Sequence, residues 1–178
     1  MKSSSNTLIF ATFLLLFFCF SCSENQSPSE ESRKAQLPKG FVTTEDLGPA
    51  LGVRELVDRE KTTSEIIVEG FIGGRKKPFT QNKAIFIVGD DSLETCDEIP
   101  GDSCPTPWDV CCEDRKKIAS SILSVQVKDG SGTILDGTLE GVSGMRAGSK
   151  IKIKGNFEKN SGPQSMLLNA YQIQMLAD

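Results

Sequence analysis

The chain has 178 residues, a net charge of −4 and a sequence pI of about 5.0. This length fits one small domain with additional segments. The acidic balance argues against a protein that binds nucleic acid through bulk positive charge, so no nucleic-acid partner is expected. The sequence contains no histidine, which excludes histidine-based catalytic triads, histidine zinc sites and histidine-ligated haem.

Residues 1–21 predict an export signal. Lys2 precedes the apolar run Leu8–Phe20, which is too short to cross a membrane, because a spanning helix takes about 20 residues. Ser21 and Cys22 follow it, and a small residue directly before a cysteine resembles the end of a bacterial lipoprotein signal. The resemblance implies an envelope protein anchored to a membrane by a lipid on Cys22 and facing the periplasm or the exterior. An ordinary signal peptide, cut near Ser21, is the alternative.

Two segments separate this signal from the rest of the chain. Residues 22–40 hold one large apolar residue, Leu37, among Ser, Glu and Pro, so we expect a disordered tether there. Residues 41–63 predict a helical lead-in with one short helix near 53–59. The spacing of Leu47, Leu51, Leu56 and Val57 in this region is roughly helical.

Beyond the lead-in, apolar residues follow the two-residue period of β-strands. Strands are predicted over 65–73, 83–89, 122–128, 133–139, 151–157 and 166–176. Gly155 lies on the inner side of its strand, where a small barrel must bend. In the last strand the apolar phase slips between Ala170 and Ile173, which indicates a bulge. No long amphipathic helix separates the strands, so the predicted fold class is all-β.

Four short segments of the predicted strands carry a family resemblance. They are Val68–Ile72 (VEGFI), Ala84–Asp91 (AIFIVGDD), Gly148–Gly155 (GSKIKIKG) and Ala170–Ile173 (AYQI). In this order they resemble the strands of a small bacterial OB-fold barrel. The resemblance implies an OB-like five-stranded barrel over 64–178, interrupted at 90–119 by a cysteine-rich loop insertion.

One motif inside the insertion is more specific. The run CPTPWDVCC, from Cys104 to Cys112, is similar to that of uncharacterised secreted bacterial proteins that carry the same insertion. That resemblance implies a fold and an extracytoplasmic location, and it implies no activity.

The insertion holds four closely spaced cysteines, Cys96, Cys104, Cys111 and Cys112. In an exported protein such a set most often forms disulfides. A bond between the adjacent Cys111 and Cys112 would close a strained ring, so we expect Cys96 and Cys104 to pair separately with these two, and no cofactor. Two alternatives remain open. Four thiolates can hold Zn²⁺ or Cu⁺, although the spacing lacks a C-x-x-C zinc knuckle, and an adjacent pair can take part in thiol redox chemistry.

A second candidate site is the loop expected between the first two barrel strands. Arg75, Lys76 and Lys77 lie in this loop, which flanks the ligand face of OB barrels, so they are placed to meet an anionic ligand or an acidic protein. Phe79 and Trp108 are candidates for stacking on such a ligand. The alternatives are a solvated hairpin tip for the basic residues and a small loop core for Trp108.

Together these features predict a lipid-anchored envelope protein with an OB-like binding or interaction module. No combination of residues typical of a catalytic site is present, so no enzymatic activity is expected. The expected partners are a membrane, through the lipid anchor, and an anionic ligand or an envelope protein. The alternative functions are metal binding or thiol redox chemistry through the cysteine cluster, and a structural role in a larger envelope complex.

Overall fold

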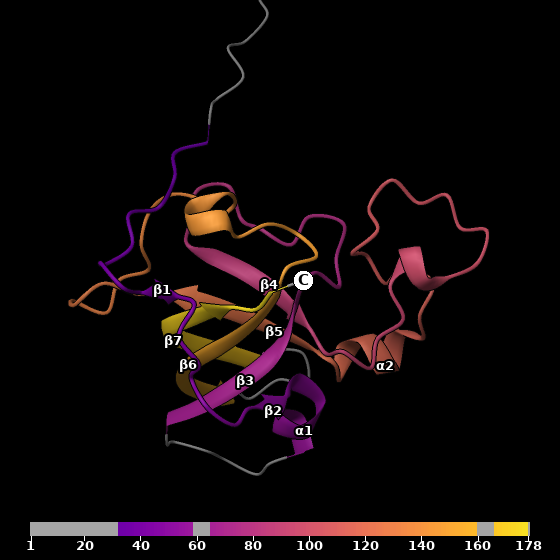
Figure 1. Ribbon diagram of the computed structural model, residues 1–178, viewed down its shortest axis with the longest axis horizontal. Helices are drawn as coiled ribbons and strands as arrows, with labels where there is room; N and C mark the ends of the chain where they lie inside the picture. The colour runs from indigo at the N-terminus through magenta and orange to yellow at the C-terminus, as the bar shows by residue number, and fades with distance from the viewer. Residues whose placement is uncertain (1–31, 59–64, 160–165, 178) are drawn as a thin grey trace, which may run out of the picture. The chain divides into compact units, whose positions relative to one another are not determined.

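Five strands close into a barrel in this computed structural model, which describes residues 32–58, 65–159 and 166–177 (Figure 1). The barrel strands are β3 (Glu65–Ile72), β4 (Ile85–Gly89), β5 (Ile122–Val127), β6 (Lys150–Lys159) and β7 (Met166–Met175). Their order is β3-β4-β5-β7-β6, and β6 pairs with β3 to close the ring. Only the β5–β7 pair of this ring is parallel. The prediction of a small, OB-like, five-stranded all-β barrel is confirmed.

Short elements before the barrel extend its sheet. Strand β1 (Val42–Thr43) pairs in parallel with β7, and β2 (Leu51–Gly52) pairs in parallel with β3. Helix α1 (Val53–Asp58) follows β2 directly, which confirms the helix predicted near 53–59. Val53 and Leu56 of this helix are fully buried, so the lead-in covers part of the barrel core. The remaining elements are α2 (Arg115–Ala119) and two 3₁₀ turns, η1 (Cys96–Glu98) and η2 (Val142–Gly144).

The core is built from the inward-facing residues of all five strands. The largest fully buried barrel side chains include Phe86, Leu123, Ile151, Ile153 and Leu168. Their two-residue spacing within each strand is the pattern that predicts the strands.

Strand β7 carries a bulge opposite Gly155. Lys154 pairs with Gln172 and Gly155 pairs with Ala170, so Tyr171 has no partner on β6 and is 43% exposed. A Cβ atom on Gly155 would lie 2.3 Å from the backbone oxygen of Asn169, so only glycine fits this close approach. The predicted bulge is confirmed.

The end of the predicted tether is ordered and lies on the barrel. Lys34 forms a parallel bridge with Thr138, where the Ala35 nitrogen donates to the Thr138 oxygen and the Thr138 nitrogen donates to the Arg33 oxygen, each at 2.8 Å. Ala35 is buried. The prediction of a disordered tether over 22–40 is therefore wrong for residues 32–40, because backbone pairing holds them, Ala35 is buried and Leu37 packs against the barrel core. Residues 22–31 and the predicted signal lie outside the described residues.

The segment predicted as a strand over 133–139 is irregular. It makes only isolated bridges, in which Ile134 pairs with Lys128, Asp136 with Lys83, and Thr138 with Lys34. At its start, the Asp129 carboxylate accepts hydrogen bonds from the backbone nitrogens of Ser131 and Thr133, which holds a turn in place of a regular ladder.

Candidate functional site

The insertion leaves the barrel after β4 and returns to β5 through α2. Its two ends are joined where the Asp90 nitrogen donates to the Ser121 oxygen at 2.9 Å. The buried Asp90 carboxylate accepts from the backbone nitrogens of Arg54, at 2.7 Å, and Ser92, at 3.0 Å. Burial would raise the pKa of Asp90, but these hydrogen bonds outweigh it and hold the pKa below its usual value. The base of the insertion is thus tied both to β5 and to the start of α1.

Backbone hydrogen bonds bring the two cysteine-bearing segments of the insertion together. The Cys96 nitrogen donates to the Asp109 oxygen at 2.8 Å, and the Asp97 nitrogen donates to the Pro107 oxygen at 3.4 Å. Below this contact, Leu93 and Val110 are buried against Phe71 of β3 in a small core of their own. The fold-back therefore places Cys96 beside the segment that carries the other three cysteines.

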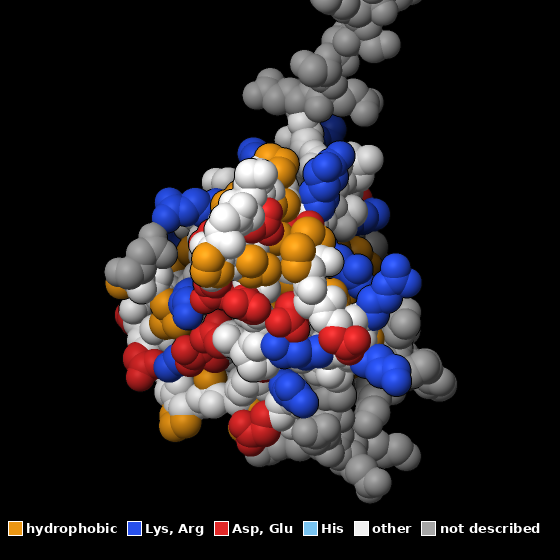
Figure 2. All heavy atoms as spheres, turned by 90° about the vertical axis from the view of Figure 1, so that its right-hand side faces the viewer, with side chains coloured by type: hydrophobic (Ala, Val, Ile, Leu, Met, Phe, Trp, Pro, Cys, Tyr) orange, Lys and Arg blue, Asp and Glu red, His pale blue; other side chains and the backbone are white. Residues whose placement is uncertain are grey.

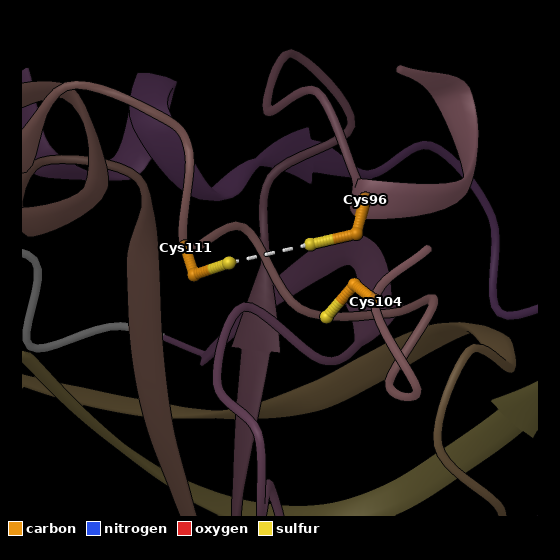
Figure 3. Close-up of side chains that lie close together, drawn as sticks. All are labelled: Cys96, Cys104 and Cys111. Carbon is orange, nitrogen blue, oxygen red and sulfur yellow. Dashed lines mark hydrogen bonds between the residues drawn. The ribbon is translucent and has the colours of Figure 1, made fainter. Parts of the chain in front are cut away.

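Three thiols converge in the resulting space (Figure 3). The Sγ atoms of Cys96, Cys104 and Cys111 all lie within 4.8 Å of one another, and the Cys96–Cys111 pair is 3.6 Å apart. Cys112 stands at the edge of this group, with its Sγ 3.9 Å from that of Cys111. Cys96 is buried, Cys104 is half-buried and Cys111 is exposed, so the cluster is closed on one side and open to solvent on the other.

The thiols differ in how readily they lose a proton. Burial, together with the hydrogen bond to Cys111, raises the pKa of Cys96 to about 12. The Thr106 hydroxyl, 3.3 Å from the Cys104 sulfur, is the main cause of a lowered pKa at Cys104. The hydrogen bond with Cys111 raises the pKa of Cys112.

All four cysteines of the insertion are free thiols in this structure. The 3.6 Å between the Cys96 and Cys111 sulfurs is well beyond the ~2.05 Å of a disulfide bond. The expected pairing of Cys96 and Cys104 with Cys111 and Cys112 is therefore not seen, and it stays a prediction about an oxidised form.

Three such sulfurs match the chemistry of a metal site. A metal–thiolate bond of ~2.3 Å places the ligand sulfurs about 4 Å apart, which is close to the spacing of the cluster. Thiolates are soft ligands that select Zn²⁺, Cu⁺ and iron–sulfur clusters over hard cations. The cluster needs only small side-chain movements to surround one soft ion.

The insertion that carries the cluster also carries exposed acidic side chains. Acidic side chains gather across the middle of the face that carries the insertion, beneath a group of hydrophobic side chains, with Lys and Arg to their right and below (Figure 2). The exposed acids of the insertion include Glu94, Asp97, Glu98 and Asp102. Their summed charge favours the approach of cations.

Arg75, Lys76 and Lys77 lie in the connection between β3 and β4, where the sequence placed them. After them, pairing with β4 resumes: the Ile87 nitrogen donates to Pro78 at 2.8 Å, and the Thr80 nitrogen donates to Ile85 at 3.0 Å. Residues 73–77 are therefore an excursion within the first hairpin, and their interpretation as a hairpin tip is wrong.

This excursion contacts the insertion through two hydrogen bonds. The Gly74 nitrogen donates to the Trp108 oxygen at 2.9 Å, and the Trp108 indole nitrogen donates to the Lys76 oxygen at 3.4 Å. The excursion and the insertion, which the sequence predicts as separate sites, therefore lie side by side.

The five residues predicted to bind a ligand have different surroundings. Phe79 is buried and its ring lies 6.1 Å from that of Phe86, so its predicted role in stacking on a ligand is wrong. Trp108 is half-buried and lines a cavity of about 350 Å³ together with Phe71. Arg75 and Lys76 line a second cavity of about 600 Å³, whereas Lys77 lines neither cavity.

The basic residue of the second cavity that sequence patterns missed is Arg115, which starts α2. The sequence carries no signal for it, because only the fold-back of the insertion brings α2 to the excursion.

Comparison of the chain with protein-family models, with curated proteins and with solved structures found no match. Within the described part of the chain, none of the helices has the length and apolar character needed to cross a membrane. The function is therefore argued from the geometry of the sites themselves.

Proposed function

We propose that this protein is a lipid-anchored envelope protein whose insertion binds one soft metal ion through the thiolates of Cys96, Cys104 and Cys111. The observation that carries the proposal is the convergence of these three sulfurs within 4.8 Å. The barrel serves as the scaffold, and Cys22 is the proposed site of the lipid.

The arrangement favours metal binding over a purely structural role of the cysteines. A loop stapled by two separate disulfides needs its sulfurs in two pairs, whereas here a third sulfur, from Cys104, joins the Cys96–Cys111 pair. Three thiolates complete a trigonal site for Cu⁺. For tetrahedral Zn²⁺ the fourth ligand would come from water or from Cys112, whose sulfur is 3.9 Å from that of Cys111.

Burial divides the roles of the three ligands. Cys96 is buried and its backbone is hydrogen-bonded to Asp109, so it gives the site a fixed position. Cys111 is exposed, so it offers a route for a metal ion to enter or leave by ligand exchange. A site with one open side suits a protein that acquires or passes on a metal better than one that uses it only for stability.

A metal titration tests the proposal. The mature chain carrying Cys22→Ser, which prevents lipidation, would be reduced under anaerobic conditions and titrated with Cu⁺ against a chromophoric chelator, and separately with Zn²⁺ and Co²⁺. We expect one equivalent to bind, seen also as added mass in native mass spectrometry. Binding should be lost in Cys96→Ser, Cys104→Ser and Cys111→Ser.

The matched control is Cys112→Ser, which removes an adjacent thiol outside the group of three and should retain one bound Cu⁺. The proposal is overturned if the exported protein binds no metal after reduction. It is also overturned if the native chain resists alkylation and its mass is lower by four hydrogens, because that result establishes two disulfides.

The lipid anchor is tested separately. Labelling of cells with a radioactive or alkyne-tagged fatty acid should mark the protein, and Cys22→Ser should abolish both the label and its recovery with membranes. Retention of the label in that variant would place the anchor elsewhere, without touching the metal site.

A further inference from the structure

The larger cavity at the junction of barrel and insertion combines three cations with an apolar floor. It has a volume of about 600 Å³ and lies between the excursion 73–77 and α2. Arg75, Lys76 and Arg115 stand at its rim, and Val110, Ile118 and Ile122 form its apolar lining. This volume lies within the range of about 300–1,000 Å³ that small-molecule sites occupy.

The charges around this cavity leave an excess of positive charge. Among the described residues, no ion pair engages the side chains of Arg75, Lys76 or Arg115. Two acids also line the cavity. Glu113 is already paired with Lys117 at 2.8 Å, and the Asp109 carboxylate accepts a hydrogen bond from the backbone nitrogen of Val110 at 2.9 Å.

We infer that this cavity binds a small organic anion, namely a carboxylate with an aliphatic or aromatic body. Its carboxylate would lie between Arg75, Lys76 and Arg115, where an arginine can donate two parallel hydrogen bonds. Its apolar body would cover Ile118 and Ile122, which are half-buried and line the cavity. The cavity takes a small molecule in this way without any metal in the thiol cluster, so this inference stands apart from the proposed function.

One thiol reports on the cavity directly, because Cys111 is among its lining residues and the adjacent Cys112 is not. Both thiols are exposed. Cys112 instead faces the Asp102 carboxylate, at 3.9 Å. Cys111 therefore lies beside basic groups and Cys112 beside an acid, so the two thiols can be compared within the same chain.

The experiment compares alkylation by iodoacetate, which is anionic, with alkylation by iodoacetamide, which is neutral and of similar size. In both reactions the cysteine thiolate attacks the methylene carbon, a C–S bond forms and iodide leaves. The metal-free, reduced chain with Cys22→Ser would be labelled briefly, and each site quantified by peptide mass spectrometry. The ratio of the two rates cancels the intrinsic reactivity of each sulfur, so it reports the local concentration of the anionic reagent.

We expect the iodoacetate-to-iodoacetamide ratio to be at least threefold higher at Cys111 than at Cys112. The double variant Arg75→Ala/Arg115→Ala should bring the two ratios together. Lys77→Ala, in the same excursion but outside the cavity lining, should leave the ratios unchanged. Equal ratios in the unmodified sequence, or an equal effect of Lys77→Ala and the double variant, would overturn the inference.

Benzoate and benzamide then test occupancy by a ligand. Benzoate should slow the alkylation of Cys111 by iodoacetamide and leave Cys112 unaffected, and benzamide should protect neither thiol. The double variant should weaken this protection at least tenfold. Equal protection by the acid and the amide would mean that charge does not select the occupant, and the inference would fail. Because metal is absent throughout, a negative metal titration leaves this result unaffected.

Discussion

The barrel and its cysteine-rich insertion are held together by different means. The barrel has one continuous core, in which side chains such as Phe86, Leu123 and Ile153 are fully buried between paired strands. The insertion has a much smaller core, in which Leu93 and Val110 are buried against Phe71 of β3 and Ile118 packs beside them. A barrel of this kind is stable without help, whereas a loop with so small a core depends on cross-links such as disulfides or a metal. Stability therefore rests mainly on the barrel, and the proposed metal site lies in the part of the chain with the smaller core.

The largest expected effect is in the barrel. Phe86→Ala should lower the free energy of unfolding by about 3–5 kcal/mol, because it leaves a cavity among fully buried side chains. Urea denaturation followed by intrinsic fluorescence or circular dichroism measures it. A loss below about 1 kcal/mol would mean that the barrel core is not the main source of stability, and the contrast with the insertion would disappear.

Binding of a metal ion should stabilise the insertion and leave the stability of the barrel unchanged. With free metal at a hundred times its dissociation constant, the free energy of opening the insertion should rise by about 2.7 kcal/mol, because opening releases the ion. Hydrogen exchange at Cys96 and Asp97, whose backbone nitrogens are hydrogen-bonded across the insertion, should slow down. Exchange in β6 and β7 should stay the same. Equal slowing in both regions would show that they open together.

Asp90 connects the two regions, and its replacement should have an intermediate effect. Asp90→Asn should cost about 2 kcal/mol at pH 7, because a buried carboxylate that accepts from the Arg54 and Ser92 nitrogens is lost. Asp91→Asn is the matched control, since Asp91 is exposed and makes only a 3.5 Å ion pair with Lys150, and it should change little.

The effect of Asp90 also carries a pH dependence of known sign. Its pKa is lower in the folded protein than the usual value of about 3.9 in an unfolded chain. The stabilisation is therefore complete above that usual value and is lost as the pH falls through the lower folded pKa. Unfolding measured at pH 7 and near pH 3 should show the difference between wild type and Asp90→Asn shrinking at the acid end. A difference that grows toward low pH would contradict this role.

The smallest effect is expected on the barrel surface. Tyr171→Ser should change the free energy of unfolding by no more than about 0.5 kcal/mol, because the bulge leaves this side chain unpaired and 43% exposed. Thermal unfolding measures it. A loss above about 1 kcal/mol would indicate that the exposed ring packs on a neighbouring surface.

The sequence predicts the barrel well because its signals are local. Two-residue periodicity marks the strands, and the phase slip before Ile173 marks the bulge. The ordered segment 32–40 was missed because it is held mainly by backbone pairing to Thr138, with only Ala35 and the partly buried Leu37 packed against the core. Backbone pairing leaves no mark in composition.

For the candidate sites too, features that are local in sequence could be predicted and those that depend on tertiary contacts could not. The four cysteines are close in sequence, so their proximity in space is predictable, whereas the grouping of Cys104 with Cys96 and Cys111 depends on how the loop folds back. Phe79 was misassigned because pairing with β4 resumes beyond the excursion and turns its ring inward. Arg115 joins Arg75 only through tertiary structure.

The bridge between Lys34 and Thr138 determines how far the folded unit can travel from a membrane. With the lipid on Cys22, as proposed, a tether over 22–40 would reach about 65 Å when fully extended, whereas residues 22–31 reach about 35 Å at most. If Cys22 carries the lipid, as proposed, the shorter tether holds the folded domain, with its thiol cluster and basic cavity, closer to the bilayer than a tether over 22–40 would.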